Sequence, residues 1–464
     1  MLSTRPRADH GPDAPPGRRH SGQRKPGRHR ALRRKGGARA GRDRLYELDL
    51  LRITAALVVV IYHYTFSGHA RHLISITFPA LSAVTRYGYL GVDMFFIISG
   101  FVVLLSAWGR RAHEFVISRI VRLYPAYWVA VTITTIVTIT LGRGLFKVTP
   151  VQYLANLTML NALPHIANVD VVYWTLYTEI RFYLLVFVLA WVGITRARVI
   201  KVLWMWLAAT AVMEAHVLPA GSAATIDLIV QSQWSHYFIA GMALCLIYRT
   251  GFCWQLGAIL VIAYANAVYQ AVNFGHLVSH RYHQPLHSPV IAAVITVIFI
   301  LMTLIALRVT RRLGRPWFAV AGALTYPLYL VHAYNGFVLI NLVGGAVDRW
   351  VLLVAMITGM GCAAYAIHHF VEVNLAARLK RALTRLAAAA SRHRPARARR
   401  GRRAGPGARC GAQPGRLAHA ARGPAHRAAD GSGGADQAQG PGSGDRRGGT
   451  GGGGRRERAR AAAR

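Results

Sequence analysis

The sequence predicts an all-α integral membrane protein with about ten transmembrane helices and two disordered basic tails. Two observations lead to this prediction. Apolar runs of about 20 residues with few internal charges recur between residues 45 and 375, the length that an α-helix needs to cross a bilayer. Outside those limits the composition changes abruptly, because residues 1–44 carry 14 Lys/Arg against three Asp and residues 376–464 carry 22 Lys/Arg against four acids.

The apolar runs divide into ten predicted spans, with boundaries uncertain by a few residues. They are residues 45–66, 87–108, 115–141, 171–192, 200–216, 226–248, 254–272, 289–307, 317–342 and 351–373. The fifth and seventh are the weakest because they are short. Residues 151–163 are apolar but too short to span, so we expect this segment to lie in the interface or to re-enter the membrane.

Three parts of the chain follow from this division: a basic tail (1–44), a membrane domain (45–375) and an Arg/Ala/Gly/Pro-rich tail (376–464). The tails contain too little apolar surface to offset the entropy of ordering, so we expect both to be disordered. Beside a membrane domain, basic tails favour contact with anionic lipid. Nucleic-acid binding is less favoured, because the tails lack aromatic residues for base stacking.

The distribution of Lys and Arg predicts that both termini are cytoplasmic. The loops between spans two and three, four and five, and eight and nine are rich in basic residues, whereas the alternate loops contain fewer. Cytoplasmic loops of membrane proteins carry the excess of Lys and Arg. An even number of spans then places both tails in the cytoplasm, with the chain in a bacterial plasma membrane.

Ionisable residues inside the predicted spans indicate a functional site, because charged groups there are costly unless paired or hydrated. Depth counting places four of them in the outer half of the membrane: His63, Asp93, Glu179 and His332. Arg52 shares a helix face with His63 but lies about 16 Å closer to the cytoplasm. Two further arginines, Arg119 and Arg122, lie at the inner surface. We therefore expect an acid–base cluster above a cationic site suited to phosphates.

Other readings of these residues remain open. Arg119 and Arg122 could be topology determinants, a buried His could be structural, and the ionisable cluster could serve a proton-coupled transporter. We expect no metal site: His276, His280, His283 and His287 have ligand-like spacing, but no Cys or acid joins them and nearby prolines oppose a continuous helix.

Five segments resemble motifs of the acyltransferase 3 family of membrane proteins. They are LDLLR (48–52) followed by His63, GVDMFFIISGF (91–101), RIVRLYP (119–125), WTLYTE (174–179) and YPLYLVH (326–332). Thr175 stands where the family usually has Ser. The segments occur in order from Tyr46 to about Phe370, and the family's ten-helix fold agrees with the predicted spans.

This resemblance implies transfer of an acyl group, expected to be acetyl, from cytoplasmic acyl-CoA to a hydroxyl of an exported carbohydrate or glycosylated metabolite. It implies that His63 is the catalytic base, that Arg52 positions the donor and that Arg119 and Arg122 contact coenzyme A. Acyl-CoA would be a substrate, and no permanently bound cofactor is expected.

From the residues themselves, we expect Asp93 or Glu179 to fix the tautomer of His63, or Glu179 to contact the acceptor. The sequence has no serine in a nucleophile-elbow motif, which favours direct transfer without a covalent intermediate. Two rivals remain: another class of membrane acyltransferase centred on His332, and a catalytically silent scaffold.

Overall fold

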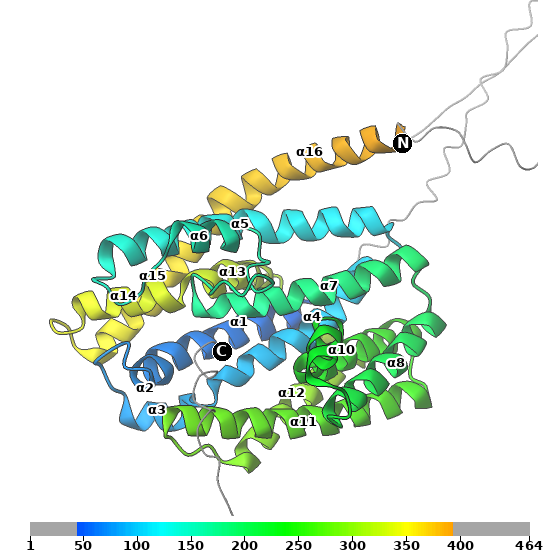
Figure 1. Cartoon of the computed structure of the whole chain (residues 1–464), viewed down its shortest axis with the longest axis horizontal. Coiled ribbons are helices and arrows are strands. Elements are labelled where there is room, and N and C mark those ends of the chain that lie inside the picture. The colour runs from blue at the N-terminus through cyan, green and yellow to red at the C-terminus, as the bar shows by residue number, and fades with distance from the viewer. Residues whose placement is uncertain (1–43, 393–464) are drawn as a thin grey trace, which may run out of the picture. The chain divides into compact units, whose positions relative to one another are not determined.

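The computed structural model describes residues 44–392, and within this part of the chain all regular secondary structure is helical, without a β-strand. The elements are α1 (Tyr46–Tyr62), η1 (His63–Ser67), α2 (Gly68–Ala70), α3 (Pro79–Thr85), η2 (Gly88–Leu90), α4 (Gly91–Ala107), α5 (Ala112–Leu141), α6 (Pro150–Asn156), η3 (Val171–Tyr173), α7 (Trp174–Val192), α8 (Arg196–Glu214), α9 (Ala220–Val230), α10 (Ser232–Thr250), α11 (Trp254–Tyr282), α12 (Ser288–Ala306), η4 (Val309–Leu313), α13 (Phe318–Val331), α14 (Ala333–Val343), α15 (Arg349–Ala366), η5 (Ile367–Glu372) and α16 (Val373–Arg392). Figure 1 shows the long helices running side by side. The all-α membrane fold is therefore confirmed.

Seven helical segments of the described residues are long and apolar enough to cross a membrane, and each overlaps a predicted span. The other three predicted spans fall on α8, on α9 with α10, and on α13 with α14. The sixth and ninth spans were predicted as unbroken helices, and this is wrong. A left-handed residue, Gln231 (φ 52°), separates α9 from α10, and His332 separates α13 from α14. The count of ten crossings stays a prediction.

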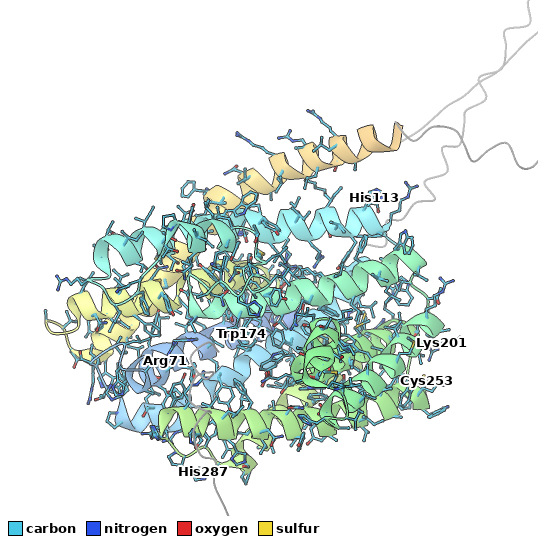
Figure 2. All side chains as sticks on the ribbon, viewed as in Figure 1. Arg71, His113, Trp174, Lys201, Cys253 and His287 are labelled. Atoms are coloured by element: carbon cyan, nitrogen blue, oxygen red, sulfur yellow. The ribbon has the colours of Figure 1, made fainter. Side chains whose placement is uncertain are left out.

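The directions of the helices agree with alternating crossings. His113 and Cys253 lie at the starts of α5 and α11, and Lys201 lies in the second turn of α8; Figure 2 shows all three toward one end of the bundle. Arg71, which follows α2, lies toward the other end. The chain therefore returns to the same end after α5 and α7, and again after α8 and the α9–α10 pair. The direction of the α9–α10 pair is therefore compatible with one predicted crossing.

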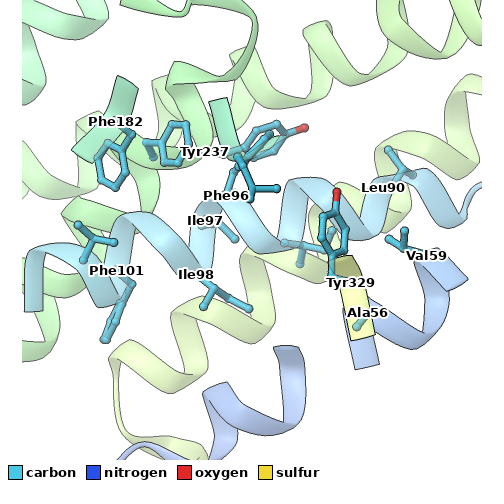
Figure 3. Close-up of a cluster of buried hydrophobic side chains, with 14 of the residues drawn as sticks. Ala56, Val59, Leu90, Phe96, Ile97, Ile98, Phe101, Phe182, Tyr237 and Tyr329 are labelled. Atoms are coloured by element: carbon cyan, nitrogen blue, oxygen red, sulfur yellow. The ribbon is translucent and has the colours of Figure 1, made fainter. Parts of the chain in front are cut away.

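The core forms where α4 packs on α10. Gly100 and Gly241 allow this close approach, because a methyl group at Gly241 would meet the Ile97 carbonyl oxygen of α4. Aromatic side chains fill the space around the pair, and Phe182 of α7 stacks on Phe238 at 4.3 Å. Figure 3 shows part of this cluster. All residues of α10 from Ser235 to Ile247 are buried, so α10 lies inside the bundle.

Large apolar side chains also cover the outer surfaces of the helices, as expected where they meet lipid. Examples are Ile139 of α5, Trp191 of α7, Val261 of α11 and Val354 of α15, each more than half exposed. Among residues 151–163, only the start is helical, as the end of α6. The hydroxyl of Tyr127 and the indole of Trp128 bind carbonyl groups of this segment, so it packs along α5.

The predicted start of disorder at residue 376 is wrong for residues 376–392, which belong to α16. This helix follows α15 and η5 without a break and packs on α5. The physical reason is that Ala, Leu, Arg and Lys favour helices, and the four leucines at 375, 379, 383 and 386 share one face. The predicted tails at 1–43 and 393–464 lie outside the described residues.

Candidate functional site

His63 lies where α1 ends and the π-helical turn η1 begins. Its imidazole is 8% exposed and contacts the ring of Phe337 on α14 at a centroid distance of 6.1 Å. The Nδ1 atom is 2.8 Å from the carbonyl oxygen of Val59, one turn earlier in α1. Insertion of an extra residue in a helical turn often accompanies functional sites, and here it sets the direction of His63.

His332 lies at the break between α13 and α14 and is fully buried. Its Nε2 is 3.2 Å from Nδ1 of His63, and its Nδ1 is 2.8 Å from the carbonyl oxygen of Tyr329. The two rings meet edge to face at 4.9 Å. The structure therefore brings together two site residues that are 269 positions apart in the sequence.

These contacts determine the tautomers of the pair in its neutral state. A carbonyl oxygen only accepts hydrogen bonds, so both Nδ1 atoms must carry a proton. His332 then presents the lone pair of Nε2 to the Nδ1–H of His63. The lone pair on Nε2 of His63 is left over, and this is the atom that can accept a proton from another molecule.

Two further residues hold the break at His332. The hydroxyl of Tyr64 donates to the carbonyl oxygen of His332 at 2.7 Å. The buried carboxylate of Asp170 accepts from the backbone N–H groups of Tyr334 at 2.9 Å and of Val172 at 3.1 Å. Asp170 therefore caps the first turns of α14 and η3 together, where backbone N–H groups lack helical partners.

A separate cavity of about 110 Å³ lies between α1, α4, α5, α7 and α13. Its lining brings together the three predicted donor-binding residues, Arg52, Arg119 and Arg122, and also Glu179. Arg122 is exposed, Arg119 is 9% exposed, and the side chain of Arg52 is 17% exposed. The cavity is therefore cationic, with one carboxylate in its wall.

Hydrogen bonds and ring contacts orient the charged groups of this cavity. Glu179 accepts from the hydroxyl groups of Ser99, at 2.8 Å, and Tyr183, at 2.5 Å. The guanidinium group of Arg119 donates to Ser106 at 2.9 Å and lies over the ring of Tyr183 at 5.6 Å. Such a network lowers the cost of burying these charges.

On α1, Arg52 lies 3.7 Å from the carboxylate of Asp49, which also accepts from Arg44 at 2.7 Å. Gly322 of α13 makes room for this carboxylate, because a Cβ there would come 2.5 Å from its oxygen. Arg52 therefore enters the cavity beside a close contact between α1 and α13.

Tyr329 stands between the cavity and the histidine pair. Its ring lines the cavity and lies 5.7 Å from the ring of His332, one helical turn away. Its hydroxyl is 3.0 Å from Oγ1 of Thr175. The cationic cavity and the imidazole pair are thus neighbouring but separate compartments in this structure.

The expected four-residue acid–base cluster is wrong in its membership. Glu179 belongs to the arginine cavity, and Asp93 forms a hydrogen bond with the hydroxyl of Tyr237 on α10. The expectation that one of these carboxylates fixes the tautomer of His63 is also wrong, because the Val59 carbonyl and His332 do this. Counting residues along each span predicted how deep Glu179 and Asp93 lie in the membrane. It could not predict the direction in which each side chain points from its helix.

Sequence reasoning missed Tyr64, Asp170 and Tyr329. Asp170 had a usable signal, since an Asp directly before an apolar run is typical of a helix N-cap. Tyr329 lies within the YPLYLVH segment, but that motif gave no reason to single it out, and Tyr64 had no signal at all. Their roles depend on contacts with residues far away in the chain.

Comparisons with known proteins agree with the motifs. The acyltransferase 3 family, described as an acyltransferase domain, matches residues 45–369, the region over which the five motifs occur. Peptidoglycan O-acetyltransferase OatA of Listeria monocytogenes is 30% identical over 105 residues. This match covers 21% of the present chain and 14% of that protein, so the chain spans only a small part of the relative's length. No solved structure matches the chain.

Replacing Asp170 by Ala should lower the free energy of unfolding by about 2–3 kcal/mol, because two backbone N–H groups lose their acceptor. Asp348→Ala is the matched control: Asp348 caps only α15, accepting from Trp350 and Val351 in an exposed setting, and should cost about 1 kcal/mol. Thermal unfolding of the purified protein in detergent measures both.

Burial raises the pKa of the Asp170 carboxyl, just outside the span that begins at Val171, to about 7. Below this pH the carboxyl is mostly neutral, as Asn is. Asp170→Asn should fall between the native protein and the Ala variant, because its amide oxygen can still accept. Equal losses for Asp170→Ala and Asp348→Ala would refute the double-capping role.

Proposed function

The chain belongs to the acyltransferase 3 family, and from this we propose that it is a membrane-embedded O-acyltransferase. It would transfer an acyl group, taken to be acetyl, from acyl-CoA to a hydroxyl of a cell-surface or exported carbohydrate or glycosylated metabolite. The observation that carries the proposal is the arrangement of two compartments. A cavity lined by three arginines ends at Tyr329, one helical turn from a buried histidine pair.

The arginine cavity suits the donor. Coenzyme A carries phosphate groups, and guanidinium groups bind phosphates with directed, charge-assisted hydrogen bonds. Arg122 is exposed and would meet the donor first, whereas Arg119 is held by Ser106 and Tyr183 deeper in the wall. Glu179 then has a role within the donor cavity, where its carboxylate balances part of the positive charge.

The histidine pair suits the transfer step. Nε2 of His63 would accept the proton of the acceptor hydroxyl while its oxygen attacks the thioester carbonyl carbon. The new C–O bond forms, the C–S bond breaks, and the coenzyme A thiolate leaves and takes up that proton. His332 would stabilise the imidazolium of His63, because its Nε2 accepts from Nδ1–H and can share that proton.

Tyr329 must move for the two compartments to join. Its ring separates the cavity from His332, and its hydroxyl is held by Thr175. Thr175 lies in the WTLYTE motif and Tyr329 in the YPLYLVH motif, so both sides of this contact belong to segments that resemble the family. We propose that donor binding displaces this ring and brings the thioester to His63.

The acceptor would approach His63 from the opposite end of the bundle. There Phe146 and Tyr334 stack at a centroid distance of 3.7 Å, and Arg71 forms a hydrogen bond with Tyr334. All three side chains are partly exposed, and aromatic rings beside a guanidinium group suit a polar acceptor such as a sugar. The similarity to an enzyme named for peptidoglycan O-acetylation supports an acceptor of the cell envelope.

The proposed setting is the bacterial plasma membrane, with both termini and the arginine cavity on the cytoplasmic side. Four basic residues of α16 (Arg378, Lys380, Arg381 and Arg385) are exposed, and we propose that they contact anionic lipid. The rival reading as a proton-coupled transporter has less support, since the family is one of acyltransferases. Transfer of acetyl from acetyl-CoA by the purified protein would decide between them.

His63→Gln should reduce turnover by about 10²–10⁴-fold, because Gln keeps hydrogen-bonding capacity but cannot act as a base. His332→Gln should reduce it less, since an amide oxygen can still accept from His63 Nδ1–H. Acyl transfer is measured with both variants, whose melting temperatures and monodispersity confirm folding. If His63→Gln keeps more than about a tenth of native turnover, His63 is not the general base.

Arg122→Ala should raise the Michaelis constant for acyl-CoA about tenfold or more and leave that for the acceptor nearly unchanged, because a phosphate contact is lost. Arg119→Ala should act in the same direction but also lower stability, since Arg119 is buried. Arg315→Ala, an exposed arginine outside the cavity, is the control. Native donor kinetics in Arg122→Ala would leave this residue as a topology determinant only.

The orientation is tested by fusions to a reporter that is active only outside the cytoplasm. A fusion after Arg392, at the end of α16, should give no activity, and one in the loop between α14 and α15, at Ala346, should be active. Activity at Arg392 would show that the chain crosses the membrane an odd number of times or in the opposite direction.

A further inference from the structure

A second hollow lies on the membrane-facing side of α7, away from the site described above. It has a volume of about 480 Å³ and lies between α7, α8 and α9. We call it the α7–α8 groove, and its lining is Arg181, Leu184, Leu185, Val188, Leu189, Val192, Arg198, Lys201, Val202, Leu228 and Ile229. Glu179 and Arg181 place the donor cavity and this groove on different faces of α7.

The groove exists because the α9–α10 crossing is broken. Before the break in the chain, α9 packs on α7 and α8. At Gln231 the chain turns through a left-handed conformation, and α10 then enters the bundle to pack on α4. α9 ends near Leu228 and Ile229. Past that point no helix of the described residues covers the outer surface between α7 and α8.

The depth of the groove is close to one leaflet of a bilayer. From Arg181 to Val192, α7 rises about 16 Å, about half of the ~30 Å hydrocarbon core. Arg181 closes the deep end, donating to the carbonyl oxygen of Asp227 at 3.3 Å and lying over the ring of Tyr177 at 4.9 Å. Aliphatic side chains form the wall between the two ends, as acyl chains require.

The other end of the groove is cationic. Arg198 and Lys201 are both exposed there, in the first two turns of α8. Arg198 donates to the carbonyl oxygens of Val192 and Gly193 at 2.9 Å, which holds its guanidinium group at the mouth. Lys201 makes no hydrogen bond or ion pair with the described residues. The positive end of the α8 dipole adds to the attraction for an anion.

We propose that the α7–α8 groove binds an anionic phospholipid, with its acyl chains against the aliphatic wall and its phosphate at Arg198 and Lys201. Neutral lipid could fill the same space but would leave the cationic mouth without a partner. The lipid takes the place of the helix that the break at Gln231 removes. This inference does not depend on the acyl-transfer reaction or on which side of the membrane the mouth faces.

The test uses the full-length protein purified in detergent and returned to nanodiscs that contain phosphatidylglycerol and phosphatidylcholine. Each lipid in turn carries a photoactivatable group on an acyl chain, and cross-linked peptides are identified by mass spectrometry. Phosphatidylglycerol should label residues 184–192 and 228–229 several times more than phosphatidylcholine does. Equal labelling by the two lipids, or labelling spread evenly over lipid-facing positions such as Ile139 and Val261, would overturn the proposal.

Two pairs of variants make the test specific. Val188→Trp fills the groove and should abolish the labelling, whereas Val261→Trp, on the exposed surface of α11, should leave it unchanged. Lys201→Gln should reduce the preference for phosphatidylglycerol about fivefold, since a basic residue near anionic lipid contributes about 1 kcal/mol. Arg312→Gln, exposed outside the groove, should not change the preference. Native labelling in Val188→Trp, or an unchanged preference in Lys201→Gln, would contradict the assignment.

Discussion

The contact between Nδ1 of His63 and Nε2 of His332 joins α1 to the break between α13 and α14, and the remainder of the site is arranged around it. Both rings are buried, and a buried N–H without an acceptor is costly. The carbonyl oxygens of Val59 and Tyr329 supply those acceptors. The same pairing of α1 with α13 directs Arg52 into the arginine-lined cavity, so one helix pair positions a part of each compartment.

The separation of charges follows from the same requirement for partners. A carboxylate beside the imidazole pair would itself need a cation or several donors at that depth. The structure instead places Glu179 among arginines and hydroxyl groups, where its charge is balanced, and pairs Asp93 with Tyr237. His63 is then oriented by neutral groups alone. A neutral imidazole is the form that can accept a proton, so this arrangement suits a general base.

The close packing of α10 on α4 and the open α7–α8 groove have a common origin. Gly100 and Gly241 let α10 approach α4 so closely that α10 becomes the most enclosed of the long helices. The chain reaches that position by turning at Gln231, and the turn leaves the α7–α8 groove on the surface. A membrane protein can tolerate such a gap because lipid chains are available to fill it, provided that polar backbone groups nearby have partners. Arg198 provides this for the last carbonyl groups of α7.

The sequence by itself determined the class of the fold, the seven long apolar helical segments and the family, because apolar length and short motifs are local properties. It also singled out His63, His332 and the three arginines as candidates, since ionisable residues stand out within apolar runs. Only the tertiary structure decided which of them meet. The face of a helix that a side chain occupies depends on rotation and packing against helices far away in the sequence. For this reason Glu179 belongs with the arginines, and the partners of His63 are His332 and the Val59 carbonyl. The breaks at Gln231 and His332 were likewise decided by tertiary contacts, since neither residue is a strong helix breaker. Groups from other parts of the chain hold these breaks, as Asp170 and Tyr64 do at His332.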